Sequence, residues 1–130
     1  MDPVVDTNVL VFDTFEGSEY HNEASSKLDS MDRWHLPSIV LHEPIWFFKV
    51  RKIQLSRARL KVEEYSTNEK TSLSQCTADD IRFASARMRN YQEYDDLVFL
   101  SVAKRLSLPL YTFDSELKQV AIRNSVRSVK

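Results

Sequence analysis

The sequence VVDTNVL at residues 4–10 decides how this chain begins to fold. Val4 and Val5 suit a short buried strand, and the apolar run that resumes at Val9 suits a helix. An acid, a hydroxyl and an amide stand between them, which is an odd place for polar side chains. Either Asp6 simply caps the helix that follows, or it is one of several carboxylates gathered around a metal ion.

Composition limits the class of protein to which the chain can belong. It has 130 residues, 42% hydrophobic and 28% charged, which predicts one globular domain spanning residues 1–130. No apolar run reaches the roughly 20 residues of a membrane span, and no signal peptide is recognisable, so we expect a cytoplasmic protein. The single cysteine excludes an internal disulfide, and the single glycine excludes a Gly-rich phosphate loop.

Charge is unevenly distributed along the chain, although the formal net charge is only -1. No acid occurs from residue 44 to residue 62, while the basic residues of that stretch are Lys49, Arg51, Lys52, Arg57, Arg59 and Lys61. Such a stretch can bind the phosphates of RNA, and binding would then weaken as salt rises. The alternative is a solvated helix face without a partner.

Periodicity and capping residues predict alternating strands and helices. Extended segments are expected at residues 3–5, 34–39, 71–75, 108–113 and 125–129. Of the helices between them, one carries Pro44 in its first turn, one is capped by Ser56, and one opens with a capping box of Thr77 and Asp80. This alternation is typical of an α/β domain with a mainly parallel sheet and helices on both faces.

Four acids stand at the ends of predicted elements, where parallel sheets bind their ligands. Asp6 and Asp114 each end an apolar strand, whereas Glu43 and Asp96 lie near the starts of apolar helices. Each acid alone has a simpler role, as a helix cap, a partner of the helix dipole or a solvated side chain. Together they would repel one another unless a cation were bound, and their oxygens suit Mg²⁺ or Mn²⁺.

The motif VVDTNVL, the helix of Glu43 and the sequence YDDLVFLSVAKRLSLPLYTFD at residues 94–114 together resemble a PIN domain of the VapC toxin type. The resemblance covers nearly the whole chain. It implies a three-layer sandwich in which a central, mainly parallel sheet of four to five strands is flanked by helices. Pro44, directly after Glu43, departs from the aliphatic residue that the family usually has there.

The resemblance implies a metal-dependent endoribonuclease that leaves 5′-phosphate and 3′-hydroxyl ends. Its catalytic and metal-binding residues would be Asp6, Glu43, Asp96 and Asp114, around Mg²⁺ or Mn²⁺. The supporting residues would be Thr7 or Thr112, which orient carboxylates, Asn8, which braces the site, and Asp95, which competes with Asp96 as the third acid. RNA would be the substrate and a cognate antitoxin protein the partner. A homodimer is also expected, because the sequence IWFF at residues 45–48, with Ile53, Leu55 and Leu60, offers more apolar surface than a small domain needs.

Two other classes of function stay open. A phosphoryl-accepting domain also places an acid at a strand end. However, Asn8 stands where a phosphatase motif has its second Asp, and the sequence LYTFDSE offers no receiver lysine. A catalytically silent PIN-like module that binds RNA or protein would keep the fold and lack the chemistry.

Overall fold

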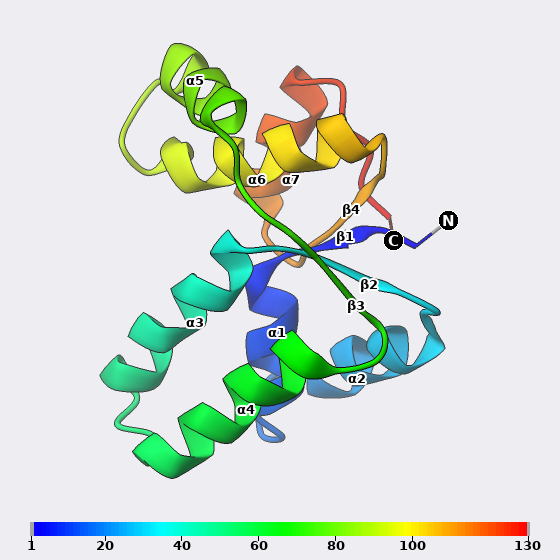
Figure 1. Ribbon diagram of the computed structural model, residues 1–130, viewed down its shortest axis with the longest axis vertical. Helices are drawn as coiled ribbons and strands as arrows, with labels where there is room; N and C mark the ends of the chain where they lie inside the picture. Colours follow the sequence, from blue (N-terminus) through cyan, green and yellow to red (C-terminus); the bar gives the residue numbers. More distant parts are fainter. Residues whose placement is uncertain (1, 130) are drawn as a thin grey trace.

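The computed structural model describes residues 2–129 and has a parallel sheet between two layers of helices (Figure 1). In chain order its elements are β1 (Val4–Val5), α1 (Thr7–Thr14), α2 (His21–Ser30), β2 (Trp34–Pro37), α3 (Ile39–Val50), α4 (Leu55–Thr67), β3 (Thr71–Ser74), α5 (Ala78–Arg87), α6 (Glu93–Leu106), β4 (Leu110–Tyr111) and α7 (Ser115–Arg123). The strands lie in the order β3-β2-β1-β4, and all neighbours are parallel. The predicted three-layer α/β sandwich is therefore confirmed.

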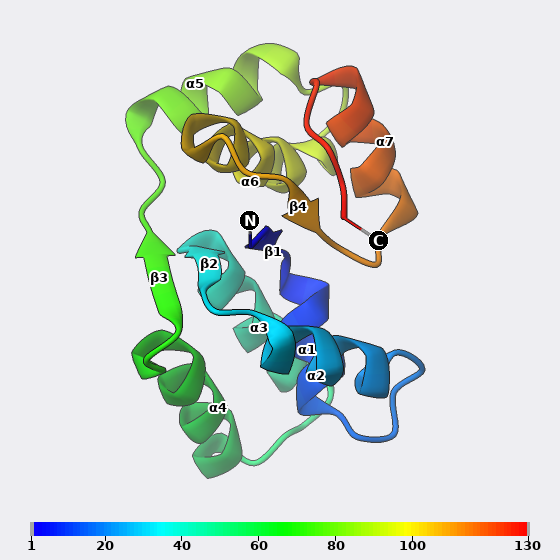
Figure 2. The ribbon, with the colours of Figure 1, turned by 90° about the vertical axis from the view of Figure 1, so that its right-hand side faces the viewer.

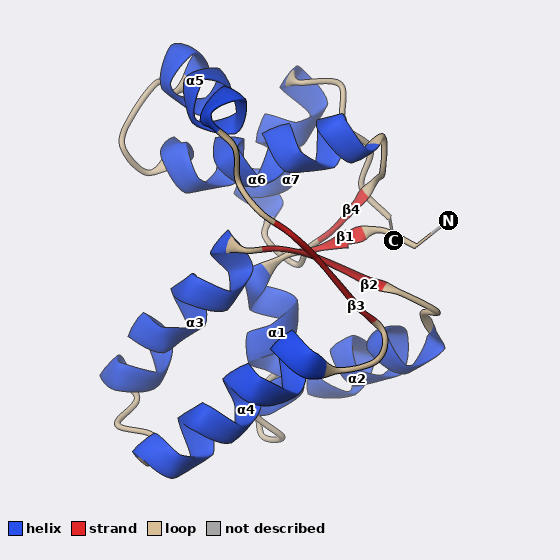
Figure 3. Ribbon diagram, viewed as in Figure 1, coloured by secondary structure: helices blue, strands red, loops and turns tan. Residues whose placement is uncertain are grey.

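The two helical layers divide the chain near its middle. Helices α1 to α4 lie on one side of the sheet, and α5 to α7 lie on the other (Figures 1 and 2). Figure 3 shows how short the strands are beside the helices that cover them. No helix within residues 2–129 has both the length and the apolar character needed to cross a membrane.

Strand β1 is the centre of the sheet although it contains only two residues. Val4 and Val5 are both fully buried. The backbone N–H of Val4 donates to the carbonyl of Pro109 at 2.8 Å, and the N–H of Asp6 donates to the carbonyl of Tyr111 at 3.0 Å. The strand and the residue after it are thereby fixed beside β4.

Two predictions about the first turns of helices were wrong. Helix α3 begins at Ile39, so Pro44 is its sixth residue and lies beyond the first turn. Proline has no N–H to donate, and therefore the i→i−4 bond to the Val40 carbonyl is missing there. Helix α4 begins at Leu55 after Gln54, so Ser56 does not cap it. The capping box of α5 was predicted correctly.

Strand lengths were also overestimated near the C-terminus. The segment predicted at residues 108–113 contains only β4, because Leu108 bonds back to the carbonyl of Ala103 at 3.1 Å. The last predicted strand is a single parallel bridge between Leu110 and Ser128. These segments are extended, but too little of their backbone is paired to lengthen the sheet.

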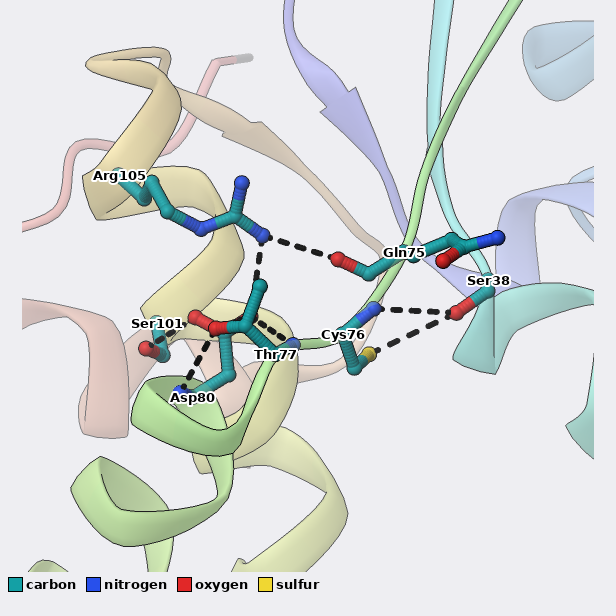
Figure 4. A network of polar contacts seen from close by, with 7 residues as sticks. All are labelled: Ser38, Gln75, Cys76, Thr77, Asp80, Ser101 and Arg105. Atoms are coloured by element: carbon teal, nitrogen blue, oxygen red, sulfur yellow. Dashed lines mark hydrogen bonds and ion pairs between the residues drawn. The ribbon is translucent and has the colours of Figure 1, made fainter.

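A buried carboxylate joins α5 to α6 (Figure 4). The side chain of Asp80 is 2% exposed. It accepts hydrogen bonds from the hydroxyl of Ser101 at 2.7 Å and from the guanidinium of Arg105 at 3.0 Å. It also accepts the Thr77 N–H at 2.8 Å, and Arg105 donates a second bond to the carbonyl of Gln75 at 3.0 Å. One acid thus completes the capping box of α5 and holds that helix against α6, which carries Asp96.

Replacing Asp80 with Ala is expected to lower the free energy of unfolding by about 2–4 kcal/mol, because Ser101, Arg105 and the start of α5 lose their shared acceptor. Asp79→Ala is the matched control, since Asp79 is exposed and pairs only with Arg82. It should cost less than about 1 kcal/mol. Urea denaturation measures both, and equal losses would mean that the buried network contributes little to stability.

Candidate active site

A pocket of about 1020 Å³ opens at the carboxyl edge of the sheet. All four predicted acids line it, and each comes from a different helix start. Asp6 and Asp114 are the N-caps of α1 and α7. Glu43 is the fifth residue of α3, and Asp96 is the fourth residue of α6. The structure therefore brings together four carboxylates that lie as many as 108 residues apart in the chain.

The two strand-end acids cap helices and line the pocket at the same time. Asp6 accepts the N–H of Thr7 at 2.7 Å, and Asp114 accepts the N–H groups of Glu116 at 2.9 Å and Leu117 at 3.4 Å. The capping alternative is thus correct for both residues. It does not account for the pocket, because a cap needs no other carboxylates nearby.

The threonine and the amide after Asp6 support the same pocket. The hydroxyl of Thr7 donates to Glu43 at 2.8 Å. The hydroxyl of Thr112 donates to the second carboxylate oxygen of Asp6 at 2.7 Å. Asn8 in turn donates from its amide to Thr112 at 3.2 Å and accepts the N–H of Phe113 at 3.3 Å. The polar triplet of residues 6–8 thereby links β1, α3 and the segment after β4.

Burial is the main reason why three of the acids hold their protons more tightly than usual. It raises the pKa of Asp6 to about 6, against the hydrogen bonds from Thr112 and Thr7 that lower it. Burial likewise raises the pKa of Glu43 to about 7. For Asp96 burial and then the neighbouring negative charges, led by that of Asp6, raise the pKa to about 7. The pocket therefore favours either bound protons or a bound cation at neutral pH.

The adjacent acids Asp95 and Asp96 occupy different surroundings. Asp96 is half-buried and lines the pocket, whereas Asp95 is exposed and lies outside its wall. The negative charge of Asp95 still raises the pKa of both Glu43 and Asp96. The side chain that faces the other carboxylates is thus that of Asp96.

Only part of the predicted basic stretch reaches the pocket. Of its six basic residues, Arg51 and Arg57 line the pocket. The remaining basic residues of the stretch, all outside the pocket wall, are Lys49, Lys52, Arg59 and Lys61. Among these, Lys61 pairs with Glu64 at 3.2 Å. The stretch is therefore a mixture of pocket-lining and solvated side chains.

The sequence did not reveal the aromatic wall of the pocket. Phe12, Phe15 and Phe47 line it. Phe47 was part of the aromatic run at residues 46–48, whose three members differ in exposure. Trp46 is 67% exposed and Phe48 only 4%. The spacing of Phe12 and Phe15 on α1 was the one available signal, because residues three apart share a helix face.

The chemistry of the pocket acids fits a hard divalent cation, because all of their donor atoms are carboxylate oxygens. Within residues 2–129, no group of three Asp, Glu, His or Cys side chains is already drawn together to hold an ion. The residues that could approach an ion are those that line the pocket, Asp6, Glu43, Asp96 and Asp114.

The parallel sheet and the acidic pocket at its carboxyl edge define an α/β domain of a known class. The PIN domain family model matches residues 4–123, and the chain belongs to that family. The fold is similar to that of VapC20 from Mycobacterium tuberculosis, described as a sarcin-ricin loop cleaving toxin. The TM-score is 0.75 and the identity 19%, over 90% of this chain and 93% of that chain. No curated protein has a matching sequence. The predicted PIN domain of the VapC type is confirmed at the level of family and fold.

Replacing Asp6 with Asn is expected to raise the free energy of unfolding of the metal-free protein by about 1–3 kcal/mol near pH 7.5. Asn caps a helix about as well as Asp, and one repelling charge is removed. The sign follows from the pKa of Asp6, which is about 6 in the folded state and 3.8 in the reference state. The native fold therefore loses stability as pH rises from about 4 through about 6, and the advantage of Asn should vanish only below about pH 4.

The measurement is thermal and urea denaturation in EDTA between about pH 3.5 and pH 8. Asp95→Asn is the control, because Asp95 is exposed and lies outside the pocket wall. Asp95→Asn should raise the free energy of unfolding by less than Asp6→Asn does. If the stability difference between Asp6→Asn and the native protein did not change with pH, Asp6 would act as a helix cap alone.

Proposed function

We propose that this protein is a Mg²⁺- or Mn²⁺-dependent endoribonuclease and the toxin of a toxin–antitoxin pair. The observation that carries the proposal is the presence of four carboxylates, from four separate helices, in one pocket at the carboxyl edge of the sheet. Membership of the PIN domain family and a fold similar to that of a VapC toxin support it.

In this proposal all four acids hold the metal, but not in the same way. Asp6 and Asp96 are direct ligands, and Asp114 and Glu43 act directly or through water. A bound Mg²⁺ or Mn²⁺ supplies a water of lowered pKa and positive charge against the phosphate. The hydroxyls of Thr7 and Thr112 orient Glu43 and Asp6, and each hydrogen bond lowers the pKa of its carboxylate.

The alternative is a catalytically silent PIN-like module that binds RNA or protein. It would share the fold and the acids, so only a cleavage assay separates it from the enzyme. The phosphoryl-accepting alternative loses its support, because the family match is to the PIN domain.

Partners form a further part of the proposal. We infer that the protein acts in the cytoplasm, that an antitoxin regulates it, and that two copies associate. Large apolar side chains on α3 and α4, each at least 46% exposed, support a self-associating surface: Ile45, Trp46, Val50, Leu55 and Leu60. Burying such a patch is favourable at about 25 cal/mol per Å² of apolar surface before the cost of association.

Asp96→Asn is expected to lower RNA cleavage in Mn²⁺ by about two orders of magnitude or more, because a metal ligand and its charge are lost. Mn²⁺ at about 100 times its Kd should stabilise the native protein by about 2.7 kcal/mol, and the variant by much less. Asp95→Asn is the control and should retain both properties. The measurements are gel-based cleavage of RNA and thermal melts with EDTA or Mn²⁺.

The possible outcomes separate the two functions. Stabilisation by Mn²⁺ without cleavage of any RNA would favour the silent binding module. If Mn²⁺ shifted the melting temperatures of the native protein, Asp96→Asn and Asp95→Asn equally, the result would contradict a metal site at these acids.

For self-association, light scattering at tens of micromolar protein should give twice the mass of one chain. Val50→Ser with Leu60→Ser should shift that mass toward the monomer, because both side chains are about two thirds exposed or more in the single chain. Ile122→Ser is the control, since Ile122 is equally exposed but lies on α7. A native protein that is monomeric at this concentration would contradict the dimer.

A further inference from the structure

The pocket has a second half that four carboxylates do not explain. Beyond the four acids, its wall includes the aromatic rings of Phe15 and Phe47 and the guanidinium groups of Arg51 and Arg57, with Glu16 as a further carboxylate beside Phe15. The volume of about 1020 Å³ is at the upper end of the roughly 300–1,000 Å³ of pockets that enclose whole organic ligands. A metal ion alone needs far less space. The second half is therefore large enough to take part of a substrate.

Two aromatic rings meet in this half of the pocket. Phe15 is the C-cap of α1, and Phe47 lies on α3. Their ring centroids are 5.4 Å apart, with an angle of 57° between the planes. Both side chains are only partly buried. They present apolar surface to the pocket instead of completing the core.

Each of the two rings has an arginine beside it. The Arg51 guanidinium carbon is 5.1 Å from the centroid of Phe47, and that of Arg57 is 6.0 Å from the centroid of Phe15. Neither arginine forms an ion pair with a carboxylate of residues 2–129, whereas Arg82, Arg89, Arg105 and Arg123 all do. The positive charges of Arg51 and Arg57 are thus available to an anion.

This arrangement places three kinds of group in one pocket: carboxylates, aromatic rings and guanidinium groups. We propose that the half formed by Phe15, Phe47, Arg51 and Arg57 is a subsite for one unpaired nucleotide of an RNA substrate. The proposal rests on the proposed function, because it names the form of RNA that the same pocket takes. The scissile phosphate lies toward the acids, a neighbouring base lies against the rings, and a further phosphate meets the guanidinium groups.

Stacking explains why the nucleotide must be unpaired. A base can lie on a phenylalanine ring only if its own face is free, and bases in a duplex are stacked on each other. Arginine suits the flanking position because its planar guanidinium both stacks on aromatic faces and binds phosphate. The subsite therefore selects single-stranded segments by shape and charge, without reading base identity.

The test is binding of a fluorescent single-stranded RNA and of the same RNA annealed to its complement, measured by anisotropy on the full chain. EDTA removes divalent cations, so binding is read without cleavage. Phe15→Leu keeps apolar volume but loses the ring, and it should weaken single-strand binding by roughly 5- to 100-fold. Phe15→Tyr keeps the ring and should bind as the native protein does. Duplex binding should be weak and should not change in either variant.

The chain offers matched controls for both kinds of contact. Arg57→Gln should weaken binding and reduce the slope of log affinity against log salt by about one. Arg59→Gln should change neither, because Arg59 is exposed on the same helix but lies outside the pocket wall. Phe83→Leu should also leave RNA binding unchanged, because Phe83 does not line the pocket. It is a matched control, since Arg87 lies 4.1 Å from the Phe83 ring in a similar pair.

Three results would overturn the subsite. The first is equal weakening of single-strand and duplex binding by Phe15→Leu. The second is an unchanged salt slope in Arg57→Gln. The third is binding of poly-glutamate, sensitive to the same variants, in place of RNA, which would mean that the surface takes an acidic protein segment. Because all readouts are binding, a protein that never cleaves RNA could still satisfy this proposal, and a nuclease that passes the Mn²⁺ cleavage test could still fail it.

Discussion

The parallel pairing of a two-residue strand with both of its neighbours is the constraint on which the site depends. Val4 and Val5 are fully buried between β2 and β4. Because β1 runs parallel to β4, the residues that follow these two strands emerge at the same edge of the sheet. Asp6 therefore lies beside Thr112, whose hydroxyl it accepts at 2.7 Å. A shift of this strand by one residue would turn Asp6 away from that edge.

The pocket collects negative charge that the fold only partly compensates. Helix starts and threonine hydroxyls donate to Asp6 and Glu43, yet burial still raises the pKa of Glu43 to about 7. A region of this kind opposes the stability of the metal-free fold near neutral pH. The neutral core and the Asp80 network between α5 and α6 supply stability to the fold. Helix α6 belongs to both, since it carries Asp96 in the pocket and Ser101 in the network.

The acidic, aromatic and basic walls of the pocket come from distant parts of the chain. Helix α1 contributes to two of them, since it begins at Asp6 and ends at Phe15. Helix α3 contributes Glu43 and Phe47, which are four residues apart and so lie on one face. The spacing of these residues along α1 and α3 sets the distance between the acids and the aromatic rings. Both kinds of group therefore line one pocket.

The sequence by itself determined the alternation of strands and helices, the family and the four acids, because hydrophobic periodicity and capping are local patterns that survive any packing. It also predicted that the residues after Val5 serve more than a helix cap. Only the tertiary structure decided between Asp95 and Asp96, since adjacent residues on a helix differ by about 100° in direction and packing fixes which one faces the pocket. The same holds for the six basic residues, of which packing turns only Arg51 and Arg57 into the pocket wall. Pro44 and the short strands were misjudged for a related reason. Pairing with neighbouring strands and packing between layers, rather than local preference, set where each element begins and ends.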